Sequence, residues 1–277
     1  MLIKFWGTRG SIPVPGSATV KYGGNTSCLE VELENSGSLI LDAGTGIRKL
    51  GNRLLKEKRL QTVDLLFTHS HWDHIQGFPF FMPIYHQGIK IRIYSPRPFL
   101  DYLQKMLVKQ MELGFFPLDF KDLDARLEFR ELKPGPASIA DAELSFLPCN
   151  HPGGAAAYKI IHNGKLMVFM TDNELSSPHP HTSWPEFTAF CRGADLLIHD
   201  AQYTSEELER NRTWGHSSHP EAVKLAREAQ VKHLVLFHHD PERNDEQIEK
   251  ILAECREIIE PGPLICTAAQ EGVSIRL

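Results

Sequence analysis

The chain has 277 residues, with 42% hydrophobic and 23% charged side chains and a formal net charge of −5. These proportions are typical of a globular protein and exclude a disordered or fibrous chain. The acidic balance argues against a broad basic surface for nucleic acid, and no apolar run reaches the roughly 18 residues of a membrane span. The start of the chain lacks a secretory signal and the five cysteines form no CxxC pair, so we expect a cytoplasmic protein with free thiols.

The first part of the chain predicts strands interrupted by one helix. Short apolar runs bounded by Gly, Asn or Asp are typical of strands, and they occur at 1–5, 27–33, 38–41, 63–68 and 90–94. Thr45 is a suitable N-cap for a helix that we expect to run to about Lys58. Pro96 and Pro98 introduce a second helix, which ends near Met111.

The rest of the chain predicts more strands and then alternating helices and strands. Strands are expected at 126–131, 143–148, 156–161, 165–171, 196–199, 231–237 and 272–277. Amphipathic helices are expected at 206–212, 220–230 and 245–259. Mixed elements of this kind predict an α/β (α+β) fold with helices outside the sheets. No linker divides the chain, so we expect a single domain over 1–277, with a helical insertion at about 97–125.

The strand at 63–68 runs directly into His69-Ser70-His71-Trp72-Asp73-His74. Alternate residues of an extended segment point the same way, so His69 and His71 can reach one metal ion. The following turn brings Asp73 and His74 back toward a neighbouring point. Imidazole and carboxylate groups are ligands that zinc and similar divalent metals prefer. The motif therefore predicts a metal site, and the alternative is a polar loop with incidental histidines.

This motif resembles the signature of the metallo-β-lactamase-fold hydrolases. Four further motifs of that superfamily have counterparts at predicted strand ends and in the same order, namely Asp42-Ala43-Gly44, Asn150-His151-Pro152, Thr171-Asp172 and Leu234 to His238. The resemblance covers nearly the whole chain. It implies a four-layer αββα sandwich in which two mixed β-sheets have helices outside.

The resemblance also implies a dinuclear metal centre. It assigns His69, His71 and His151 to one divalent metal, Asp73, His74 and His238 to the second, and Asp172 to a bridge between them. Zinc is the expected metal, with manganese or iron as alternatives, since these metals share such ligands. Asp42 would support the metal loops from outside the ligand set. His239 competes with His238, which is preferred because it ends the apolar run, and is assigned to a supporting or substrate-binding role.

A closer resemblance is to ribonuclease Z and related phosphodiesterases. It rests on the loop Gly7-Thr8-Arg9-Gly10-Ser11, on His199-Asp200-Ala201 and on Gly215-His216-Ser217-Ser218. It implies a metal-dependent hydrolase that cleaves a nucleotide-type phosphodiester, cyclic substrates included, with a metal-bridging hydroxide. Asp73 then serves catalysis as well as metal binding. His199, oriented by Asp200, is the first candidate for protonating the leaving group, and His216 is the second.

Three further groups are candidates for substrate binding. The glycine-rich turn that contains Asn25 and Thr26 can offer backbone N–H groups to a phosphate, and Arg9 can pair with an anion. The alternatives are a tight turn and a surface arginine. Aromatic residues after the metal loop are candidates for a base-stacking pocket or for the core. The helix near Pro98 is expected to serve the core, a dimer contact or a substrate cover.

Several different functions remain open at this point. A tRNA 3′-processing endonuclease is less favoured, because the stretch between His151 and Asp172 is short and the chain has no basic run. The fold is also compatible with an acyl hydrolase for thioesters, lactones or lactams, with a redox enzyme and with a non-catalytic metal-bound sensor. The expected partner is a small phosphodiester or nucleotide, without a membrane; structured RNA is less favoured and a homodimer is left open.

Overall fold

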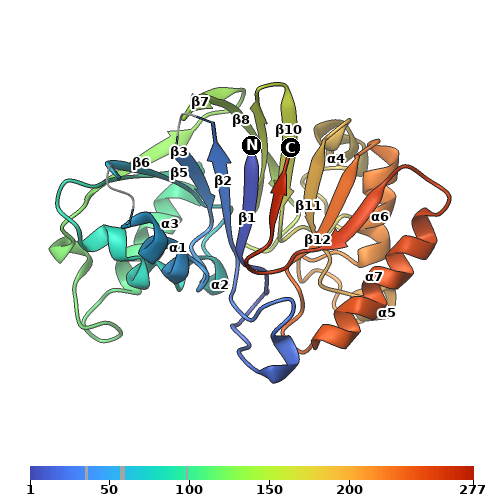
Figure 1. Cartoon of the computed structure of the whole chain (residues 1–277), viewed down its shortest axis with the longest axis horizontal. Helices are drawn as coiled ribbons and strands as arrows, with labels where there is room; N and C mark the ends of the chain where they lie inside the picture. The colour runs from blue at the N-terminus through green and yellow to red at the C-terminus, as the bar shows by residue number, and fades with distance from the viewer. Residues whose placement is uncertain (35–36, 57–59, 98) are drawn as a thin grey trace.

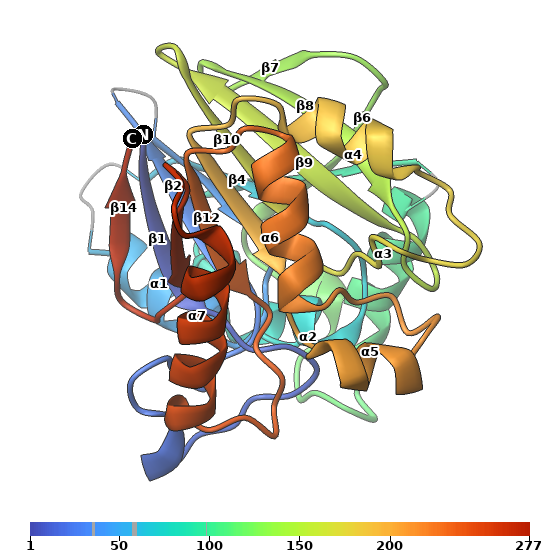
Figure 2. The same cartoon turned by 90° about the vertical axis from the view of Figure 1, so that its right-hand side faces the viewer.

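The computed structural model describes residues 1–34, 37–56, 60–97 and 99–277 (Figure 1). Two β-sheets of seven strands each lie face to face, and helices cover both outer faces (Figures 1 and 2). The expected four-layer αββα sandwich with two mixed sheets is therefore confirmed. No helix in the described part of the chain is both long and apolar enough to cross a bilayer.

The first sheet has the strand order β14-β1-β2-β3-β4-β5-β6. Its strands are β1 (Leu2–Gly7), β2 (Cys28–Leu33), β3 (Gly37–Leu41), β4 (Thr62–Leu66), β5 (Lys90–Pro96), β6 (Arg126–Leu132) and β14 (Ser274–Arg276). Strands β3 to β6 are parallel, whereas β14, β1, β2 and β3 pair antiparallel. The N- and C-terminal strands are thus neighbours (Figure 1).

The second sheet has the order β13-β12-β11-β10-β9-β8-β7. Its strands are β7 (Ala137–Ile139), β8 (Ala142–Cys149), β9 (Ala155–His162), β10 (Lys165–Met170), β11 (Leu196–Asp200), β12 (His233–Phe237) and β13 (Ile265–Ala268). Strands β10 to β13 are parallel, and the hairpin of β9 and β10 turns at 163–164 as expected. Strands β3, β4, β8, β10, β11 and β12 therefore deliver their carboxyl ends to one rim of the sandwich.

The helices connect these strands on the outside. They are α1 (Ile47–Leu54), α2 (Trp72–Ile75), α3 (Phe99–Lys109), α4 (Trp184–Cys191), α5 (Ser205–Arg210), α6 (His219–Glu228) and α7 (Asp245–Ile259), with short 3₁₀ turns at Ser17–Thr19, Phe78–Phe80, Met82–Tyr85 and Phe120–Asp122. Helices α1 and α3 flank the first sheet, and α4, α6 and α7 flank the second (Figures 1 and 2).

Three apolar cores hold the four layers together. The sheets share a core that includes Phe5, Phe169 and Phe237, all 0–1% exposed. Each sheet also has a core against its own helices, because successive side chains of a strand point to opposite faces. Strands buried on both faces have continuous apolar runs. The sequence therefore identifies where these strands lie, but not which of their side chains point toward the helices and which toward the other sheet.

Several boundaries differ from the sequence expectation. Strands β7 and β13 and helix α4 were not expected, because β7 is a three-residue edge strand and the other two are short segments beside prolines. Thr45 does not cap α1; its hydroxyl accepts a hydrogen bond from the backbone N–H of Thr26, and Gly46 precedes the helix. The expected helix end at Lys58 and the expected start at Pro98 lie outside the described residues.

The segment that the sequence sets apart at about 97–125 joins β5 to β6. It contains α3, which buries Leu100, Leu103 and Leu107 against the first sheet, and the turn at Phe120–Asp122. We keep the single domain with a helical insertion as an interpretation of this arrangement.

Candidate metal centre and active site

The backbone is strained where the strands reach the shared rim. Asp42 follows β3, Asp172 comes two residues after β10, and His238 follows β12. Their φ angles are +62°, +50° and +58°. Residues other than glycine rarely adopt this left-handed region, and such strain is concentrated at functional sites. The three side chains are therefore held in place by the surrounding structure rather than by local preference.

Four predicted ligands form a first group. One nitrogen or oxygen atom from each of His69, His71, His151 and Asp172 lies within 4.8 Å of the others. His71 Nδ1 is 2.9 Å from His151 Nε2, and His69 Nε2 is 3.7 Å from Asp172 Oδ2. The β4 end thus contributes two imidazoles, and the second sheet contributes the other two side chains.

Three more predicted ligands form a second group beside the first. Atoms of Asp73, His74 and His238 also lie within 4.8 Å of one another. The second carboxylate oxygen of Asp172, Oδ1, is 3.1 Å from His74 Nε2 and 3.3 Å from His238 Nε2. Asp172 therefore has one oxygen near each group. The structure brings all seven predicted ligands together, in the two sets and with the shared aspartate that the resemblance implies.

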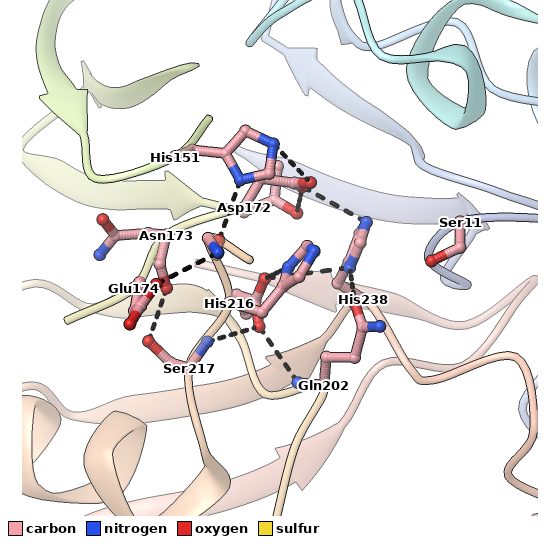
Figure 3. A network of polar contacts seen from close by, with 12 residues as sticks. Ser11, His151, Asp172, Asn173, Glu174, Gln202, His216, Ser217 and His238 are labelled. Atoms are coloured by element: carbon pink, nitrogen blue, oxygen red, sulfur yellow. Dashed lines mark hydrogen bonds and ion pairs between the residues drawn. The ribbon is translucent and has the colours of Figure 1, made fainter. Parts of the chain in front are cut away.

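Residues behind the ligands fix the orientation of the imidazole rings. Nδ1 of His74 is 2.8 Å from Asp42 Oδ2, and Asp42 Oδ1 accepts the backbone N–H of Thr68 at 2.8 Å. Nδ1 of His151 donates to the backbone carbonyl of Gly215 at 3.0 Å (Figure 3). Partners of this kind set the tautomer and leave Nε2 available to a metal. Asp42 thus lies where the resemblance expects it, behind the ligands.

The third oriented ring is that of His238. Its Nδ1 lies 3.0 Å from Gln202 Oε1 (Figure 3). Its Nε2 lies 3.1 Å from Asp73 Oδ2. Asp73 itself accepts the backbone N–H of Ser11 at 2.8 Å. Sequence reasoning missed Gln202, Ser11 and Thr68 as supports, although Gln202 directly follows the His199-Asp200-Ala201 motif.

The residues fit a pair of divalent metal ions. Nε2 of His69 is buried and has no hydrogen-bond partner among the residues that the structure describes. Nε2 of His74 is also buried and, although it lies 3.1 Å from Asp172 Oδ1, it makes no hydrogen bond of acceptable geometry with a described residue. Unpartnered buried nitrogens are costly, and a metal ion would be their natural partner. Burial alone would raise the pKa of Asp172, but the surrounding His238, His74 and His69 hold it well below its usual range. A deprotonated carboxylate is the form that binds metal.

His216 and Asp200 form a pair next to these groups. His216 Nδ1 lies 2.6 Å from Asp200 Oδ2, and Asp200 Oδ1 accepts the backbone N–H groups of Ser217 and Gln202 (Figure 3). The His216 ring stacks on the His238 ring, with ring centroids 5.0 Å apart, and meets the His151 ring edge-on, with ring centroids 5.4 Å apart. An atom of His216 also lies within 4.8 Å of Asp172 and His238. The pair therefore borders the predicted metal centre.

The expected pairing of His199 with the Asp200 carboxylate is wrong. His199 is fully buried, and its Nδ1 donates to the backbone carbonyl of Asp200 at 2.6 Å. In β11, Leu197 belongs to the core against the helices and Ile198 to the core between the sheets. Strand alternation therefore turns His199 toward the helices, and Asp200 toward the site.

The substrate-binding expectation for Arg9 is also not supported. Its guanidinium is fully buried and donates to the backbone carbonyls of Gly23, Asp240 and Arg243. His239 is likewise buried, and its Nε2 donates to the carbonyl of Ala269 at 2.8 Å. Both side chains therefore join loops to one another. Nη2 of Arg9 has no partner among the described residues, but it is buried and not exposed to a ligand in solvent.

The glycine-rich turn is occupied by internal contacts. The backbone N–H and the side-chain amide of Asn25 both donate to the carboxylate of Glu271, at 2.5 and 2.9 Å. Thr26 exchanges hydrogen bonds with Thr45, at 3.0 and 2.9 Å. The tight-turn alternative describes this segment, because the donors of Asn25 and Thr26 already have partners.

Glu174 is another support that the sequence did not reveal. This carboxylate is 1% exposed and accepts the backbone N–H groups of Thr213 and Gly215 at 3.1 and 3.2 Å (Figure 3). It thereby holds the carbonyl of Gly215 in reach of His151. No motif signals this role, since it depends on contacts between segments that are 39 and 41 residues apart.

Comparisons with known proteins agree with this geometry. A ribonuclease Z from Gemmatimonas aurantiaca is 26% identical, with 100% of this chain and 96% of that protein aligned. The solved metallo-β-lactamase fold protein YhfI from Bacillus subtilis has a TM-score of 0.73 at 20% identity, covering 99% of each chain. A diphosphatase from the PhnP family has a TM-score of 0.69 at 17% identity, covering 100% of this chain and 97% of its own. At these identities the two solved structures establish the fold alone.

The family itself follows from a match over most of the chain. Residues 38–239 match the family described as the beta-lactamase superfamily domain. This range includes all seven predicted metal ligands, the supporting Asp42 and the His216–Asp200 pair. The fold, the His/Asp cluster and the relatives all place the protein in the ribonuclease Z-like branch of the metallo-β-lactamase-fold hydrolases. The chain therefore belongs to the beta-lactamase superfamily domain family.

Proposed function

We propose that this protein is a phosphodiesterase that uses two divalent metal ions, with zinc as the first choice, to cleave a nucleotide-type phosphodiester. The observation that carries the proposal is the arrangement of two ligand groups around Asp172, with the His216–Asp200 pair at their edge. The names ribonuclease Z and diphosphatase among similar proteins denote cleavage of phosphorus–oxygen bonds, which favours a phosphodiester over an acyl substrate.

His69, His71 and His151 would hold one metal, and Asp73, His74 and His238 the other, with Asp172 contributing to both. When bound, two such cations activate water and neutralise the negative oxygens of the reacting phosphate. Hydrogen bonds from the supporting residues hold the imidazole nitrogens and the ionised carboxylates in fixed positions. The ligands are therefore already arranged for the positive charge of the two cations.

His216 is the residue that we assign to protonation of the leaving oxygen. Asp200 holds its Nδ1, so the ring is fixed in one orientation and Nε2 is left to carry the transferred proton. Two backbone N–H groups keep the carboxylate of Asp200 in place. We therefore assign protonation of the leaving oxygen to His216, although the sequence made His199 the first candidate.

The first test is hydrolysis of bis(p-nitrophenyl) phosphate by metal-stripped protein reloaded with zinc or manganese. A phosphomonoester, a chromogenic lactam and a thioester run beside it. We expect turnover of the diester, loss of turnover in His71→Ala, and retention in His86→Ala, an exposed histidine away from the site. Turnover of an acyl substrate with none of the diester would contradict the proposal. Two bound metals without turnover of any ester would point to a sensor.

Processing of tRNA 3′ ends is the second candidate, and the name ribonuclease Z on relatives that align over 96% and 98% of their own length favours it. Against it, the β9–β10 hairpin takes up the short stretch between His151 and Asp172, and the net charge is −5. Endonucleolytic cleavage of a precursor tRNA by the zinc-loaded protein, at rates above those for a dinucleotide, would make this the better description.

A further inference from the structure

An open pocket lies directly beside the predicted metal loop. Its volume is about 520 Å³, which is within the range of roughly 300–1,000 Å³ of small-molecule sites. Ser70 and Trp72, the chain neighbours of His71, form one wall. Residues of α3 and of the segment after it also line the pocket, among them Met106, Lys109, Gln110 and Phe116.

Aromatic side chains give the pocket planar walls. Trp72 is 69% exposed and Phe80 is 52% exposed, whereas the neighbouring Phe78 and Phe81 are fully buried in the core. The rings of Phe80 and Phe116 meet edge-on, with centroids 5.6 Å apart. The aromatic run after the metal loop thus separates into core residues and pocket residues. Large apolar side chains gathered at the surface mark an interaction site.

Two polar side chains at the pocket have no side-chain partner among the residues that the structure describes. Nε2 of Gln110 is buried and makes no hydrogen bond with any residue that the structure describes. Lys109 lines the same pocket and forms no ion pair within the described ranges. An amide without a partner and a cation beside aromatic walls suit a planar group with hydrogen-bonding edges that is joined to an anion.

We propose that this pocket binds the nucleobase of the substrate, stacked against Trp72 and Phe116, while the phosphate lies at the neighbouring metal centre. This inference rests on the proposed function and specifies its substrate class. Stacking on aromatic side chains accepts any base, and it contributes about 1–3 kcal/mol per base. The amide of Gln110 and the ammonium of Lys109 would interact with the base edge and the anionic part.

The test compares two ligands that share a sugar phosphate and differ only in the base. Binding of adenosine 5′-monophosphate and ribose 5-phosphate to the zinc-loaded protein is measured by isothermal titration calorimetry. We expect the nucleotide to bind about 10-fold more tightly. The ratio of the two dissociation constants should fall toward one in Trp72→Ala and in Phe116→Ala. The second variant is the cleaner one, because Phe116 is not adjacent in sequence to any predicted metal ligand. The preference should persist in Tyr102→Ala, an exposed aromatic of α3 outside the pocket.

The outcomes separate this proposal from the proposed function. Equal binding of the two ligands, or a preference that survives both pocket substitutions, would overturn the nucleobase site even if the diester is hydrolysed. A base preference without hydrolysis of any diester would support the pocket and contradict the phosphodiesterase. If Phe116→Ala instead converts a dimer into monomers in sedimentation and leaves the binding ratio unchanged, the pocket is an interface between copies of the chain.

Discussion

At the scale of single residues, the site depends on side chains that are oriented by a second set of contacts. His74, His151 and His238 each have Nδ1 engaged, by Asp42, the carbonyl of Gly215 and Gln202 respectively. A ligand held in this way keeps Nε2 in position before any metal binds, so that less entropy is lost on binding. Asp172 is the residue on which both groups depend, because its two oxygens face different groups.

Replacement of Asp172 by Asn should abolish paired metal binding. Asn tolerates the left-handed backbone at this position, but it lacks the negative charge that balances the surrounding histidines. We expect metal content to fall from two ions to one or fewer, and diester hydrolysis to fall by at least about 100-fold. Elemental analysis and circular dichroism check the result, with exposed Asp101→Asn as the control. Full turnover with an unchanged metal content would refute the bridging role.

Replacement of His216 by Gln should slow the release of poor leaving groups. We expect kcat to fall by about 100-fold or more for an alkyl ester, and much less for p-nitrophenyl esters, because p-nitrophenolate leaves without a proton. His199→Gln should show no such dependence on the leaving group, since His199 faces the helices. Rates across a series of leaving groups decide between the two histidines. An equal loss for all esters in His216→Gln would instead indicate metal binding.

At the scale of elements, the site is built where tight turns meet at the ends of strands. The backbone N–H of Gly77 donates to the carbonyl of Ala43 at 2.9 Å, so the residues after α2 lie directly on the turn after β3. A Cβ atom at Gly77 would lie 2.0 Å from the carbonyl oxygen of Gly44. Both turns carry site residues, Asp42 on one side and His74 on the other. Their close approach therefore positions the ligand and its support together.

Gly77→Ala should accordingly push α2 away from the turn at 42–44. We expect a loss of about 1–3 kcal/mol in the free energy of unfolding and weaker metal binding, because the contact between His74 and Asp42 is displaced. Gly114→Ala is the matched control, since a Cβ atom there has nothing within 4 Å. Urea denaturation and metal titration measure the two effects. Equal free energies of unfolding for both variants would show that the two turns accommodate the added Cβ atom without a loss of stability.

At the scale of the whole molecule, the predicted metal centre joins the two sheets. Residues 69–74 follow β4 of the first sheet, whereas His151, Asp172 and His238 follow strands of the second. The contact between Asp73 Oδ2 and His238 Nε2, at 3.1 Å, crosses from one half to the other. The apolar core between the sheets provides the underlying attachment. Bound metals would add a second connection at the rim.

Metal removal should therefore lower the thermal stability of the whole chain. A ligand that binds only the folded state stabilises it by about 4 kcal/mol when its concentration is 1,000 times its Kd. We expect a clear fall in Tm after chelation, and recovery when zinc is returned. In Asp172→Asn the response to zinc should be much reduced. Calorimetry of stripped and reloaded protein measures both, and an unchanged Tm would exclude a stabilising metal pair.

The stability of the metal-free protein should also fall in mild acid. Burial, reinforced by the nearby Arg9, lowers the pKa of His239 to about 3. The unfolded chain takes up a proton there below about pH 6.5 and the folded chain does not, so stability is lost as the pH falls from 6.5 toward 3. The loss at pH 5 is about 2 kcal/mol. In His239→Gln the difference between pH 7.5 and pH 5 in urea denaturation should shrink by that amount; an unchanged difference would contradict this origin.

The sequence by itself determined the layers of this protein and the ligands that meet at their rim. Continuous apolar runs identify buried strands, and a histidine or aspartate that directly follows such a run must lie at a strand end. Parallel strands end at the same edge of a sheet, so the residues that follow neighbouring strands lie close together. These are local patterns, and they needed no knowledge of packing. Together with the resemblance to the metallo-β-lactamase-fold hydrolases, they led to the seven predicted ligands and to Asp42, which the structure gathers at one place.

Only the tertiary structure decided how the remaining polar residues are used. Strands buried on both faces show no alternation in the sequence, so nothing local tells that Asp200 faces the site and His199 the helices. Arg9 and Asn25 looked available for substrate, but partners from segments more than 200 residues away already engage them. The pocket beside the metal loop likewise exists because α3 folds against it. Contacts between distant segments follow from the packing of whole layers, which no local pattern records.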